Sequence, residues 1–334
     1  MYIFVLGVYV FTSILFFKYP TLIREKKKLK FQCKHISHRG GAGESLENTL
    51  TAFRHGLDEG TQMLELDCQL TRDGQVVVLH DSNLLRLTGV DKDVSDLDYS
   101  DLPLLKTDLP IEFDPGKLLL IYRKIPLLSQ VFQEFPKTPI NIDIKQNNDI
   151  LISKVNELII QHCREDLTVW GNLRDEVVKK CYSLNKNINV FFSLRQVIYL
   201  ILLFYSGLLP FVPLKETHLE IFLPSIYLRR IRLDGGGQLS FSPFLLHATN
   251  ILLMKRALFK HLSKRGIQTY IWVLNDETDF QQAFQLGATG VMTDYPSKLR
   301  AFLENCEKEK SNAVSKQWTE SANLVNFVGD PANT

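Results

Sequence analysis

The stretch that decides the fold of this 334-residue chain is 38–81, which reads HRGGAGESLENTLTAFRHGLDEGTQMLELDCQLTRDGQVVVLHD. Near its middle, MLELD at 63–67 alternates aliphatic with acidic side chains. Successive side chains of a β-strand point to opposite faces of the sheet. Glu65 and Asp67 therefore share one face of a predicted strand, and the leucines share the other.

Apolar runs typical of strands recur along the chain, and helical patterns separate most of them. The runs lie at 35–37, 63–67, 140–145, 167–170, 190–193, 221–223, 268–274 and 290–293. Apolar residues at helical spacing lie at 50–57, at 128–135 and at 280–284, where Gly287 follows as a stop signal. Strands that alternate with helices form a parallel sheet, and eight such units close into a TIM (β/α)8 barrel. Residues 35–303 match the size of that α/β fold, about 250 residues.

The polar faces of two strands are predicted to point into this barrel. In INIDIK at 140–145, Asn141, Asp143 and Lys145 alternate with isoleucines, as Glu65 and Asp67 alternate with leucines. Such a polar face would be ordinary on a surface strand, but in a barrel the helices cover the outer face. Charged side chains inside must be paired or must bind a metal.

Composition agrees with a globular protein and argues against several classes. Hydrophobic residues make up 45% of the chain and charged residues 23%, which is ordinary for a folded domain. The formal net charge of +2 gives no sign of a nucleic-acid partner. The five cysteines form no CxxC pair, so they indicate neither a zinc site nor a disulfide framework.

The N-terminus, residues 1–18, is predicted to be a transmembrane anchor. Residues 2–17 carry no charge and would form a helix of roughly 24 Å, slightly shorter than a hydrocarbon core of about 30 Å. A cleaved signal peptide would need a positive charge before this run and small residues after it, and neither is present. The basic linker 19–34 follows the run, so the positive-inside rule places the rest of the chain in the cytosol. The alternative, a buried helix of a soluble protein, leaves these basic residues unexplained.

Asp73-Gly74, between two strand-like runs, is a strong signal for a β-hairpin. With a two-residue turn there, the ladder places Asp67 opposite His80. Directly opposed side chains lie about 5 Å apart on one face of a sheet. His80 is therefore predicted to lie beside the carboxylates of the first polar strand, unless a bulge or a longer turn shifts the register.

Three carboxylates on the polar faces indicate a metal site. Glu65, Asp67 and Asp143 supply hard oxygen donors, which suit Mg²⁺ or Ca²⁺ better than zinc. One divalent cation there would polarise a phosphodiester and stabilise the charge that develops on its oxygens. The residues leave the choice between the two metals open.

The basic residues around this site suit acid–base chemistry on a phosphate ester. His38 and His80 are expected to act as general base and general acid, because imidazole titrates near neutral pH. Arg39 and Lys145 are expected to bind the phosphate, the first through its planar fork and the second as a point charge.

Four further residues are candidates for supporting roles, and each has a structural alternative. Glu47 and Asn48 either orient a histidine or a metal-bound water, or cap the helix that begins near residue 50. Asp81 either fixes the tautomer of a histidine or lies in a solvated loop. Trp272 either forms a wall of the substrate pocket or packs in the core.

Taken together, these motifs resemble those of the glycerophosphodiester phosphodiesterases over nearly all of residues 35–303. The motifs are His38-Arg39-Gly40, Glu47-Asn48-Thr49, Glu65-x-Asp67, His80-Asp81, Asp143-x-Lys145, Trp272 with Asn275, and Gly290-Val291-Met292-Thr293-Asp294-Tyr295-Pro296. The resemblance implies a TIM barrel of the phospholipase C-like phosphodiesterase type. It also implies metal binding by three carboxylates and catalysis by two histidines, namely Glu65, Asp67, Asp143, His38 and His80. The N-terminal run and GLLPFVP at 207–213 are more similar to a membrane-bound vertebrate branch of lysophospholipases D.

The chain departs from the family pattern at two positions. Leu46 stands where many members have proline, and Asp143 stands where many have glutamate. Because aspartate is one methylene shorter, the metal would lie deeper or take an extra water. Residues 84–125 are predicted to be an insertion after the His-Asp motif, and 304–334 to be a flexible polar tail.

A second apolar segment, 196–214, is uncharged throughout. It follows the fifth strand, so it is expected to leave the barrel at the carboxyl rim, where barrel active sites lie. A second membrane span would put the last strands across the bilayer and split the barrel. An outer helix needs one apolar stripe, whereas 197–205 is apolar on all sides. The segment is therefore predicted to be a rim helix that dips into the lipid interface and presents single-chain lipids to the metal.

The expected activity is that of a metal-dependent lysophospholipase D. It would hydrolyse lysophosphatidylcholine, lysophosphatidylethanolamine or N-acyl forms of the latter to lysophosphatidic acid and free choline, ethanolamine or N-acylethanolamine. The reaction would proceed by direct attack of water or through a cyclic phosphate. One alternative is release of glycerol 3-phosphate from soluble glycerophosphodiesters, and another is an inactive membrane scaffold.

The expected partners are one of these substrates and the lipid bilayer. The expected location is a single pass through a membrane, that of the endoplasmic reticulum, with the catalytic domain facing the cytosol.

Overall fold

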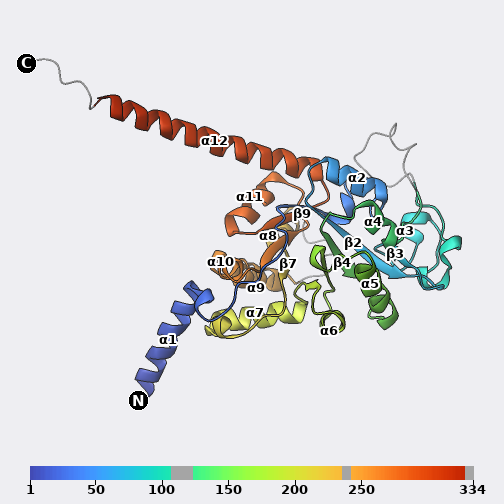
Figure 1. Ribbon diagram of the computed structural model, residues 1–334, viewed down its shortest axis with the longest axis horizontal. Coiled ribbons are helices and arrows are strands. Elements are labelled where there is room, and N and C mark those ends of the chain that lie inside the picture. Colours follow the sequence, from blue (N-terminus) through green and yellow to red (C-terminus); the bar gives the residue numbers. More distant parts are fainter. Residues whose placement is uncertain (107–122, 235–241, 328–334) are drawn as a thin grey trace, which may run out of the picture.

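The computed structural model describes residues 1–106, 123–234 and 242–327 of the chain, and a sheet with eight parallel strands lies at its centre (Figure 1). The parallel strands are β1 (His35–Ser37), β2 (Met63–Leu70), β4 (Ile140–Ile144), β5 (Thr168–Gly171), β6 (Asn189–Val190), β7 (His218–Phe222), β8 (Gln268–Trp272) and β9 (Gly290–Thr293). Their order is β6-β5-β4-β2-β1-β9-β8-β7, and β3 (Val76–Val78) pairs antiparallel with β2.

The two ends of this sheet meet, which nearly closes it into a barrel. An isolated parallel bridge joins Phe191, just after β6, to His218 in β7. The amide of Phe192 also donates to the carbonyl of His218 at 3.0 Å. The predicted TIM barrel is confirmed in this nearly closed form.

Helices surround the strands as an outer layer (Figure 1). They are α2 (Leu50–Asp58), α4 (Leu128–Glu134), α5 (Asp149–Gln161), α6 (Asp175–Leu184), α7 (Leu194–Ser206), α8 (Pro224–Asp234), α9 (Pro243–Leu253), α10 (Arg256–Lys264) and α11 (Glu277–Leu286). The helical patterns predicted at 50–57, 128–135 and 280–284 correspond to α2, α4 and α11. Gly287 ends α11 with a φ of 95°, the left-handed conformation that favours glycine.

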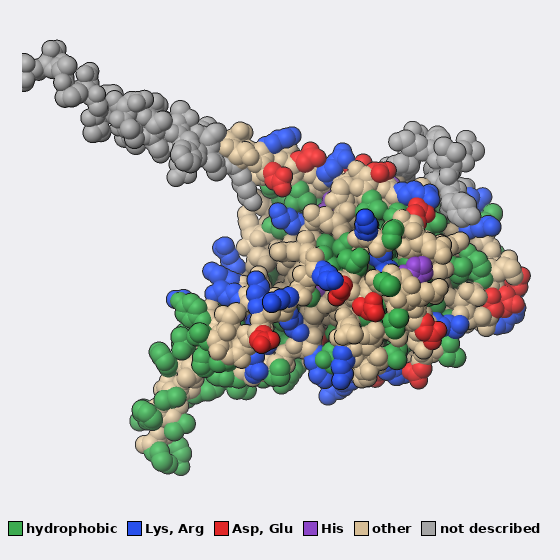
Figure 2. Space-filling view, in the orientation of Figure 1, with side chains coloured by type: hydrophobic (Ala, Val, Ile, Leu, Met, Phe, Trp, Pro, Cys, Tyr) green, Lys and Arg blue, Asp and Glu red, His purple; other side chains and the backbone are tan. Residues whose placement is uncertain are grey.

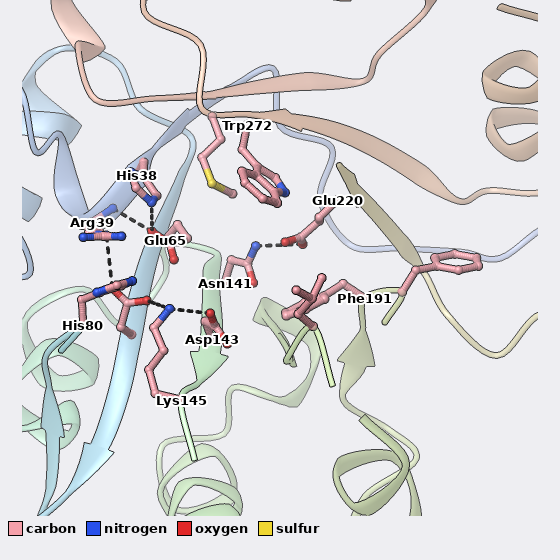
Figure 3. A pocket seen from close by; sticks show the side chains of 14 residues that line it. His38, Arg39, Glu65, His80, Asn141, Asp143, Lys145, Phe191, Glu220 and Trp272 are labelled. Carbon is pink, nitrogen blue, oxygen red and sulfur yellow. Dashed lines mark hydrogen bonds and ion pairs between the residues drawn. The ribbon is translucent and has the colours of Figure 1, made fainter. Parts of the chain in front are cut away.

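Strands β2 and β4 have the two unlike faces that their alternation predicts. Leu64 and Leu66 of β2 and the isoleucines of β4 are fully buried in a core cluster with side chains of α2, α4 and α5. Each such side chain contributes about 1.5–3 kcal/mol by leaving water. In the ladder between the strands, Glu65 lies beside Asn141 and Asp67 lies beside Asp143. The polar side chains consequently meet on the inner face (Figure 3).

The hairpin between β2 and β3 differs from the expected register by one residue. The observed pairing leaves three residues, 72–74, in the loop instead of two. Gly74 has a φ of 75°, which suits the last position of a three-residue hairpin loop. The backbone of Asp67 therefore pairs with Leu79, whose amide donates to its carbonyl at 2.9 Å, and not with His80. His80 lies beyond the end of β3 and reaches the barrel from the following turn.

The N-terminal apolar run forms helix α1 (Tyr2–Lys18), which contacts the barrel near the end of α7. The hydroxyls of Tyr9 and Ser13 donate to the carbonyls of Ser206 and Gly207, the second at 2.7 Å. Figure 2 shows hydrophobic side chains along the part of α1 that projects from the barrel.

The predicted transmembrane anchor is wrong, because none of the described helices is long and apolar enough to cross a membrane. The 17 residues of α1 extend about 26 Å, short of a hydrocarbon core of about 30 Å. The single-pass location in the endoplasmic reticulum membrane, with the catalytic domain facing the cytosol, depended on this anchor and is corrected with it.

Helix α7 is an outer helix of the barrel, contrary to the expectation of a rim helix. Its residues Val197, Leu200 and Leu203 are buried in the core cluster that also contains side chains of β7 and β8. The expectation was wrong because the opposite face of α7 is apolar as well: Ile198 and Leu202 are 52% and 63% exposed there. Apolarity on all sides therefore did not prevent this helix from packing against the barrel.

The segment expected to be an insertion, 84–125, covers β3 in its described parts. It contains α3 (Leu85–Thr88) and short 3-10 turns at Val94–Asp96 and Tyr99–Asp101. Leucines of this segment pack with Val77 in a separate apolar cluster. Residues 107–122 of the predicted insertion lie outside the described residues.

The segment expected to be a flexible tail, 304–334, is helical as far as it is described. Helix α12 runs over Pro296–Phe327 and projects away from the barrel (Figure 1). No glycine or proline occurs between residues 297 and 327, and glutamate, lysine, alanine and leucine are frequent there. These residues favour a helix, which accounts for the difference from the expectation. Residues 328–334 lie outside the described residues.

Candidate active site at the carboxyl end of the barrel

A pocket of about 260 Å³ lies where the carboxyl ends of the strands meet (Figure 3). Its lining includes every residue predicted to be catalytic, metal-binding or phosphate-binding, together with the tryptophan: His38, His80, Glu65, Asp67, Asp143, Arg39, Lys145 and Trp272. The three remaining candidates, Glu47, Asn48 and Asp81, lie behind these residues and contact them.

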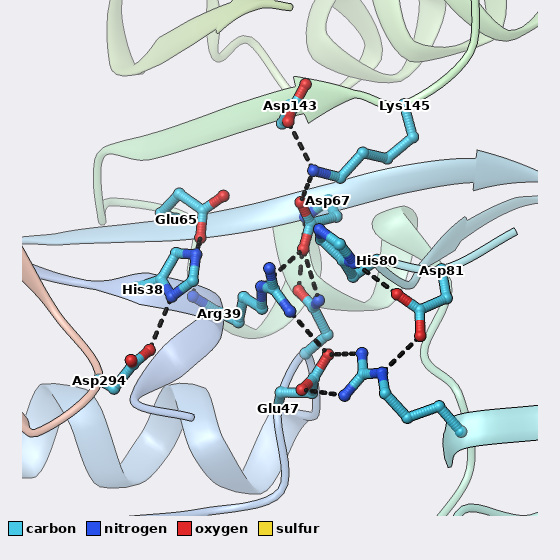
Figure 4. Close-up of polar contacts among 12 residues, drawn as sticks. His38, Arg39, Glu47, Glu65, Asp67, His80, Asp81, Asp143, Lys145 and Asp294 are labelled. Atoms are coloured by element: carbon cyan, nitrogen blue, oxygen red, sulfur yellow. Dashed lines mark hydrogen bonds and ion pairs between the residues drawn. The ribbon is translucent and has the colours of Figure 1, made fainter. Parts of the chain in front are cut away.

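His38 follows β1 directly and is held by a carboxylate from the other end of the chain. Its Nδ1 lies 2.7 Å from Oδ1 of Asp294 (Figure 4). Nδ2 of Asn275 donates to the other oxygen of Asp294 at 3.0 Å. Its Nε2 lies 4.0 Å from Oε2 of Glu65. Burial by itself would lower the pKa of His38, but the carboxylates of Glu65 and Asp294 outweigh burial and raise it.

His80 is held in the same way by its neighbour in the sequence. Its Nδ1 lies 2.6 Å from Oδ1 of Asp81, and its carbonyl accepts from Nε2 of Gln69 at 2.9 Å. Both histidines therefore have a carboxylate at Nδ1, which leaves Nε2 for a ligand. Two alternatives were open for Asp81, contact with a histidine or a place in a solvated loop. The structure shows the contact with His80.

Arg86, which sequence reasoning missed, connects the two sides of the site. Its guanidinium donates to both oxygens of Glu47, at 2.9 and 2.7 Å, and its Nε donates to Asp81. Glu47 in turn accepts from Nη1 of Arg39 at 3.1 Å. This chain of ion pairs links Arg39, which was predicted to bind the phosphate, to His80. It passes through α3, an element that carries none of the recognised motifs.

Asn48 contacts the site and does not cap the following helix. The N-cap of α2 is Thr49, whose hydroxyl accepts from the amide of Ala52 at 3.1 Å. Nδ2 of Asn48 instead donates to Oδ2 of Asp67 at 2.8 Å. Asn48 and Arg39 have φ angles of 58° and 50°, a left-handed backbone that is unfavourable for most residues and is retained mainly where function requires it.

Asp67 is the most heavily paired carboxylate of the pocket and is almost fully buried. Nζ of Lys145 lies 2.7 Å from Oδ1 of Asp67 and 2.6 Å from Oδ2 of Asp143. Nε of Arg39 lies 3.5 Å from Oδ2 of Asp67. Burial would raise the pKa of Asp67, but Lys145 and Arg39 lower it below its ordinary value.

At two other carboxylates of the pocket, burial outweighs the stabilising contacts, although Glu65 accepts from the amide of Arg39 at 2.7 Å. Burial, and then the negative charge of Asp67, raise the pKa of Glu65 to about 7. Burial raises the pKa of Glu220 to about 8, although a hydrogen bond from Asn141 opposes the change. This part of the pocket therefore has more acidic groups than nearby positive charges, a condition that a bound cation would relieve.

The metal prediction receives no direct support from the side-chain arrangement. Within the described ranges, no group of three or more histidine, cysteine or acidic side chains is arranged to hold a metal ion. Lys145 lies between Asp67 and Asp143, where a cation would be expected. The donor set nevertheless suits a hard cation, because three carboxylates line one small pocket and Glu65 has too little positive charge beside it.

Apolar side chains line the other part of the pocket. They are Leu173, Phe191, Phe192, Trp272 and Met292. Trp272 is partly exposed and lies 6.1 Å, between ring centroids, from Phe222. It therefore forms part of the pocket wall and also contacts its neighbours in the barrel, so the two alternatives for it are both partly correct.

Asp294, Glu220 and Arg86 were not predicted as site residues. Asp294 occurred in a recognised motif but without a role, because nothing in the sequence pairs it with His38. Glu220 belongs to the alternating run His218-Leu219-Glu220-Ile221-Phe222. That alternation was a usable signal, but the predicted strand began at residue 221 and left Glu220 outside. Arg86 carries no pattern that would have revealed it.

Comparison with known proteins places the chain among phosphodiesterases. The sequence profile of the glycerophosphoryl diester phosphodiesterase family matches residues 38–298. Lysophospholipase D GDPD1 of Homo sapiens is 54% identical over 306 residues, which cover 90% of this chain and 95% of the relative. Lysophospholipase D GDPD3 of Mus musculus is 42% identical over 308 residues, which cover 91% and 92%.

Solved structures agree on the fold. The glycerophosphoryl diester phosphodiesterase domain of a Mycobacterium tuberculosis protein superposes with a TM-score of 0.63 at 16% identity. The superposition covers 81% of this chain and 99% of the other. At such low identity the likeness establishes the barrel architecture alone.

The fold and the pocket together define a barrel enzyme that hydrolyses phosphoric diesters. The family profile covers most of the chain, and the two relatives are aligned over nearly their whole lengths. The chain belongs to the glycerophosphoryl diester phosphodiesterase family, as the resemblance of its motifs predicted.

Proposed function

We propose that this chain is a lysophospholipase D, which hydrolyses lysophosphatidylcholine, lysophosphatidylethanolamine or N-acyl lysophosphatidylethanolamine to lysophosphatidic acid and a free headgroup. The observation that carries the proposal is the division of the pocket into two sides. One side holds both imidazoles with Arg39 and Lys145, which suits a phosphodiester. The other side is apolar and suits the beginning of an acyl chain. The relatives that are named lysophospholipase D support this substrate class.

The two histidines are proposed to move the protons of the reaction through Nε2. One Nε2 accepts the proton of the attacking oxygen, and the other donates a proton to the headgroup oxygen as its bond to phosphorus breaks. The headgroup leaves as an alcohol, and the phosphate stays on the glycerol unit. Arg39 and Lys145 stabilise the charge on the remaining phosphate oxygens. The attacking oxygen belongs to water or, in the cyclic alternative, to the free glycerol hydroxyl.

A single divalent cation, Mg²⁺ or Ca²⁺, is proposed to be held by Glu65, Asp67 and Asp143. The raised pKa of Glu65, caused by burial and by Asp67, supports a cation there. When bound, the cation would polarise the phosphodiester and stabilise negative charge on its oxygens. Lys145 would then give up part of its contact with the two aspartates and pair with the substrate phosphate.

Product analysis tests the proposed substrate. Purified protein is incubated separately with lysophosphatidylcholine and with glycerophosphocholine, and the products are separated. Free choline and lysophosphatidic acid from the first substrate would support the lysophospholipase D. Turnover of glycerophosphocholine alone, with release of glycerol 3-phosphate, would favour the soluble-substrate alternative. No product from either substrate would favour the inactive scaffold.

Chelation is expected to abolish turnover, because Glu65 and the two aspartates would repel both one another and the substrate phosphate without a cation. The measurement is turnover of lysophosphatidylcholine after EDTA treatment, followed by add-back of Mg²⁺ and of Ca²⁺ separately. Recovery with one ion identifies the preferred metal. Undiminished activity in EDTA would contradict the proposed metal site.

The exposed face of α7 is proposed to contact the lipid surface that carries the substrate. Replacing Ile198 and Leu202 by serine is expected to lower turnover of lysophosphatidylcholine in vesicles by about tenfold or more, since each side chain gains about 1.5–3 kcal/mol in an apolar environment. Both side chains are more than half exposed, so the core face of α7 stays intact. Turnover of water-soluble glycerophosphodiesters is expected to be unchanged.

A matched control for this double variant is available on the helix α5. Ile150 and Ile160 are 59% and 46% exposed there, and their replacement by serine is expected to leave vesicle turnover unchanged. An equal loss of activity on vesicle-bound and soluble substrates in the α7 variant would contradict the lipid contact.

A further inference from the structure

Glu220 and Asn141 form a polar pair in the pocket that the proposed reaction does not use. Glu220 belongs to β7 and Asn141 to β4, and β5 and β6 separate these strands around the barrel. Nδ2 of Asn141 donates to Oε1 of Glu220 at 2.8 Å (Figure 3). Among the described residues, this is the one hydrogen bond of the Glu220 side chain, and Oδ1 of Asn141 is buried without a partner.

The surroundings of this pair make its unused hydrogen-bonding capacity unfavourable. Phe191, Trp272 and Met292 line the same pocket and offer no oxygen or charged group to the pair. A buried polar atom without a partner costs about 1–3 kcal/mol. A buried acceptor kept without a partner at this cost is well placed to receive a hydrogen bond from a ligand.

The geometry of a glycerophospholipid brings a hydroxyl into this region. The phosphodiester is expected between Arg39 and Lys145, and the glycerol unit continues from one of its oxygens toward the apolar side. In a single-chain lipid the secondary carbon of glycerol carries a free O–H, which can donate a hydrogen bond. In a two-chain lipid the same carbon carries an ester, which cannot donate.

The volume of the pocket also favours a single-chain lipid. Its volume of about 260 Å³ is below the range of about 300–1,000 Å³ that holds drug-sized ligands. A glycerophosphate unit with one emerging chain is compatible with such a volume.

We propose that Glu220 and Asn141 bind the free secondary hydroxyl of the glycerol unit and thereby select single-chain over two-chain lipids. The inference rests on the proposed lysophospholipase D function and names the residues that set its specificity. A site built to bond a substrate hydroxyl rejects an analogue that lacks it, because the buried polar groups of the protein are then left unpaired.

Direct binding tests the proposal independently of the reaction mechanism. The probes are two non-hydrolysable phosphonate analogues of lysophosphatidylcholine, one with the secondary hydroxyl and one with hydrogen in its place. The wild-type protein is expected to bind the hydroxyl analogue about tenfold tighter or more. In Glu220→Leu this preference is expected to fall below about threefold, while the deoxy analogue binds as tightly as to wild type. Isothermal titration measures all four dissociation constants.

Two further variants keep the test decisive if Glu220→Leu does not fold. Glu220→Gln retains the size and an amide for hydrogen bonding, so part of the preference is expected to remain. Asn141→Leu removes the partner and is expected to reduce the preference as Glu220→Leu does. Thermal unfolding of each variant shows that it is folded before binding is measured. An unchanged preference in the leucine variants, or an equal loss for both analogues, would overturn the proposal.

The same measurement separates this proposal from the proposed function. If wild-type protein binds neither lysolipid analogue, the lysophospholipase D function fails. The hydroxyl preference is then measured with the corresponding glycerophosphocholine phosphonates, which carry the same hydroxyl without a chain. Absence of any preference in wild type, for either pair of probes, would refute the role of Glu220 and Asn141 alone.

Discussion

His38→Ala is expected to lower kcat for phosphodiester hydrolysis by about 10²- to 10⁴-fold, the range typical for loss of a general acid or base. KM is expected to change little, because the variant keeps Arg39 and Lys145, the proposed phosphate-binding residues. The substituted ring is the one whose Nδ1 contacts Asp294 at 2.7 Å and whose Nε2 lies in the pocket. Steady-state kinetics with lysophosphatidylcholine measures both parameters.

Asp294→Asn separates the chemistry of His38 from its positioning. The carboxylate of Asp294 helps to raise the pKa of His38, so its removal is expected to lower that pKa. The limb of the pH–rate profile that reports His38 should therefore move to lower pH, with a smaller loss of kcat than in His38→Ala. A purely structural role of Asp294 would change activity without moving this limb.

A matched control for the histidine variant lies on α9. His247 is exposed and does not line the pocket, so His247→Ala is expected to retain wild-type kinetics. If His38→Ala retained activity within about tenfold of wild type, the acid–base role of His38 would be contradicted.

The sequence predicted the parts of the site that lie on strands with a clear period. Glu65, Asp67 and Asp143 alternate with aliphatic residues, so their common face followed from the pattern, and a barrel has one inner face for all of them. Glu220 obeys the same rule, yet its strand was placed three residues late and the prediction missed it. Periodicity therefore locates inward side chains only as well as it locates the strand ends.

Contacts between distant segments could not be predicted from the periodicity of the strands. The pairing of His38 with Asp294 depends on β1 lying beside β9, and a list of motifs does not show which carboxylate meets which histidine. The register of the β2–β3 hairpin differs from the prediction because its loop holds three residues instead of two. His80 nevertheless lines the pocket, because it lies in the turn beyond the ladder and does not depend on strand pairing.

Arg86 illustrates a further limit. It joins Glu47 to Asp81 from α3, which belongs to the segment regarded as an insertion. Exposed arginines are common, and only three-dimensional contact distinguishes this one. The strongest composition signals were the uncharged run at 2–17 and the uncharged segment 196–214. They predicted a transmembrane anchor and a rim helix, whereas the structure has a helix too short to span a membrane and an outer helix of the barrel.

Asp67→Asn is expected to lower kcat/KM by at least about 10³-fold, because it removes a charge that serves three functions in the site. Asp67 is proposed to bind the metal, and it also pairs with Lys145 at 2.7 Å and accepts from Asn48 at 2.8 Å. Asparagine keeps the size of the side chain, so the loss reports the charge. The concentration of Mg²⁺ or Ca²⁺ that gives half-maximal activity is expected to rise.

Two opposing effects determine the free energy of unfolding of Asp67→Asn. Removing one partner of a buried ion pair typically costs about 3–5 kcal/mol. Asp67 also raises the pKa of Glu65, however, so its neutralisation lets Glu65 ionise and supply negative charge for Lys145 and Arg39. The free energy of unfolding is therefore expected to fall by about 3 kcal/mol, at the lower end of that range.

A surface aspartate provides the control for this variant. Asp166 pairs with Lys30 where both side chains are more than half exposed, so Asp166→Asn is expected to change the free energy of unfolding by less than about 1 kcal/mol. Denaturant unfolding of both variants measures the difference. Asp67→Asn with wild-type kcat/KM and an unchanged cation requirement would show that the buried carboxylate serves the fold alone, and that the reaction proceeds without Asp67 as a metal ligand.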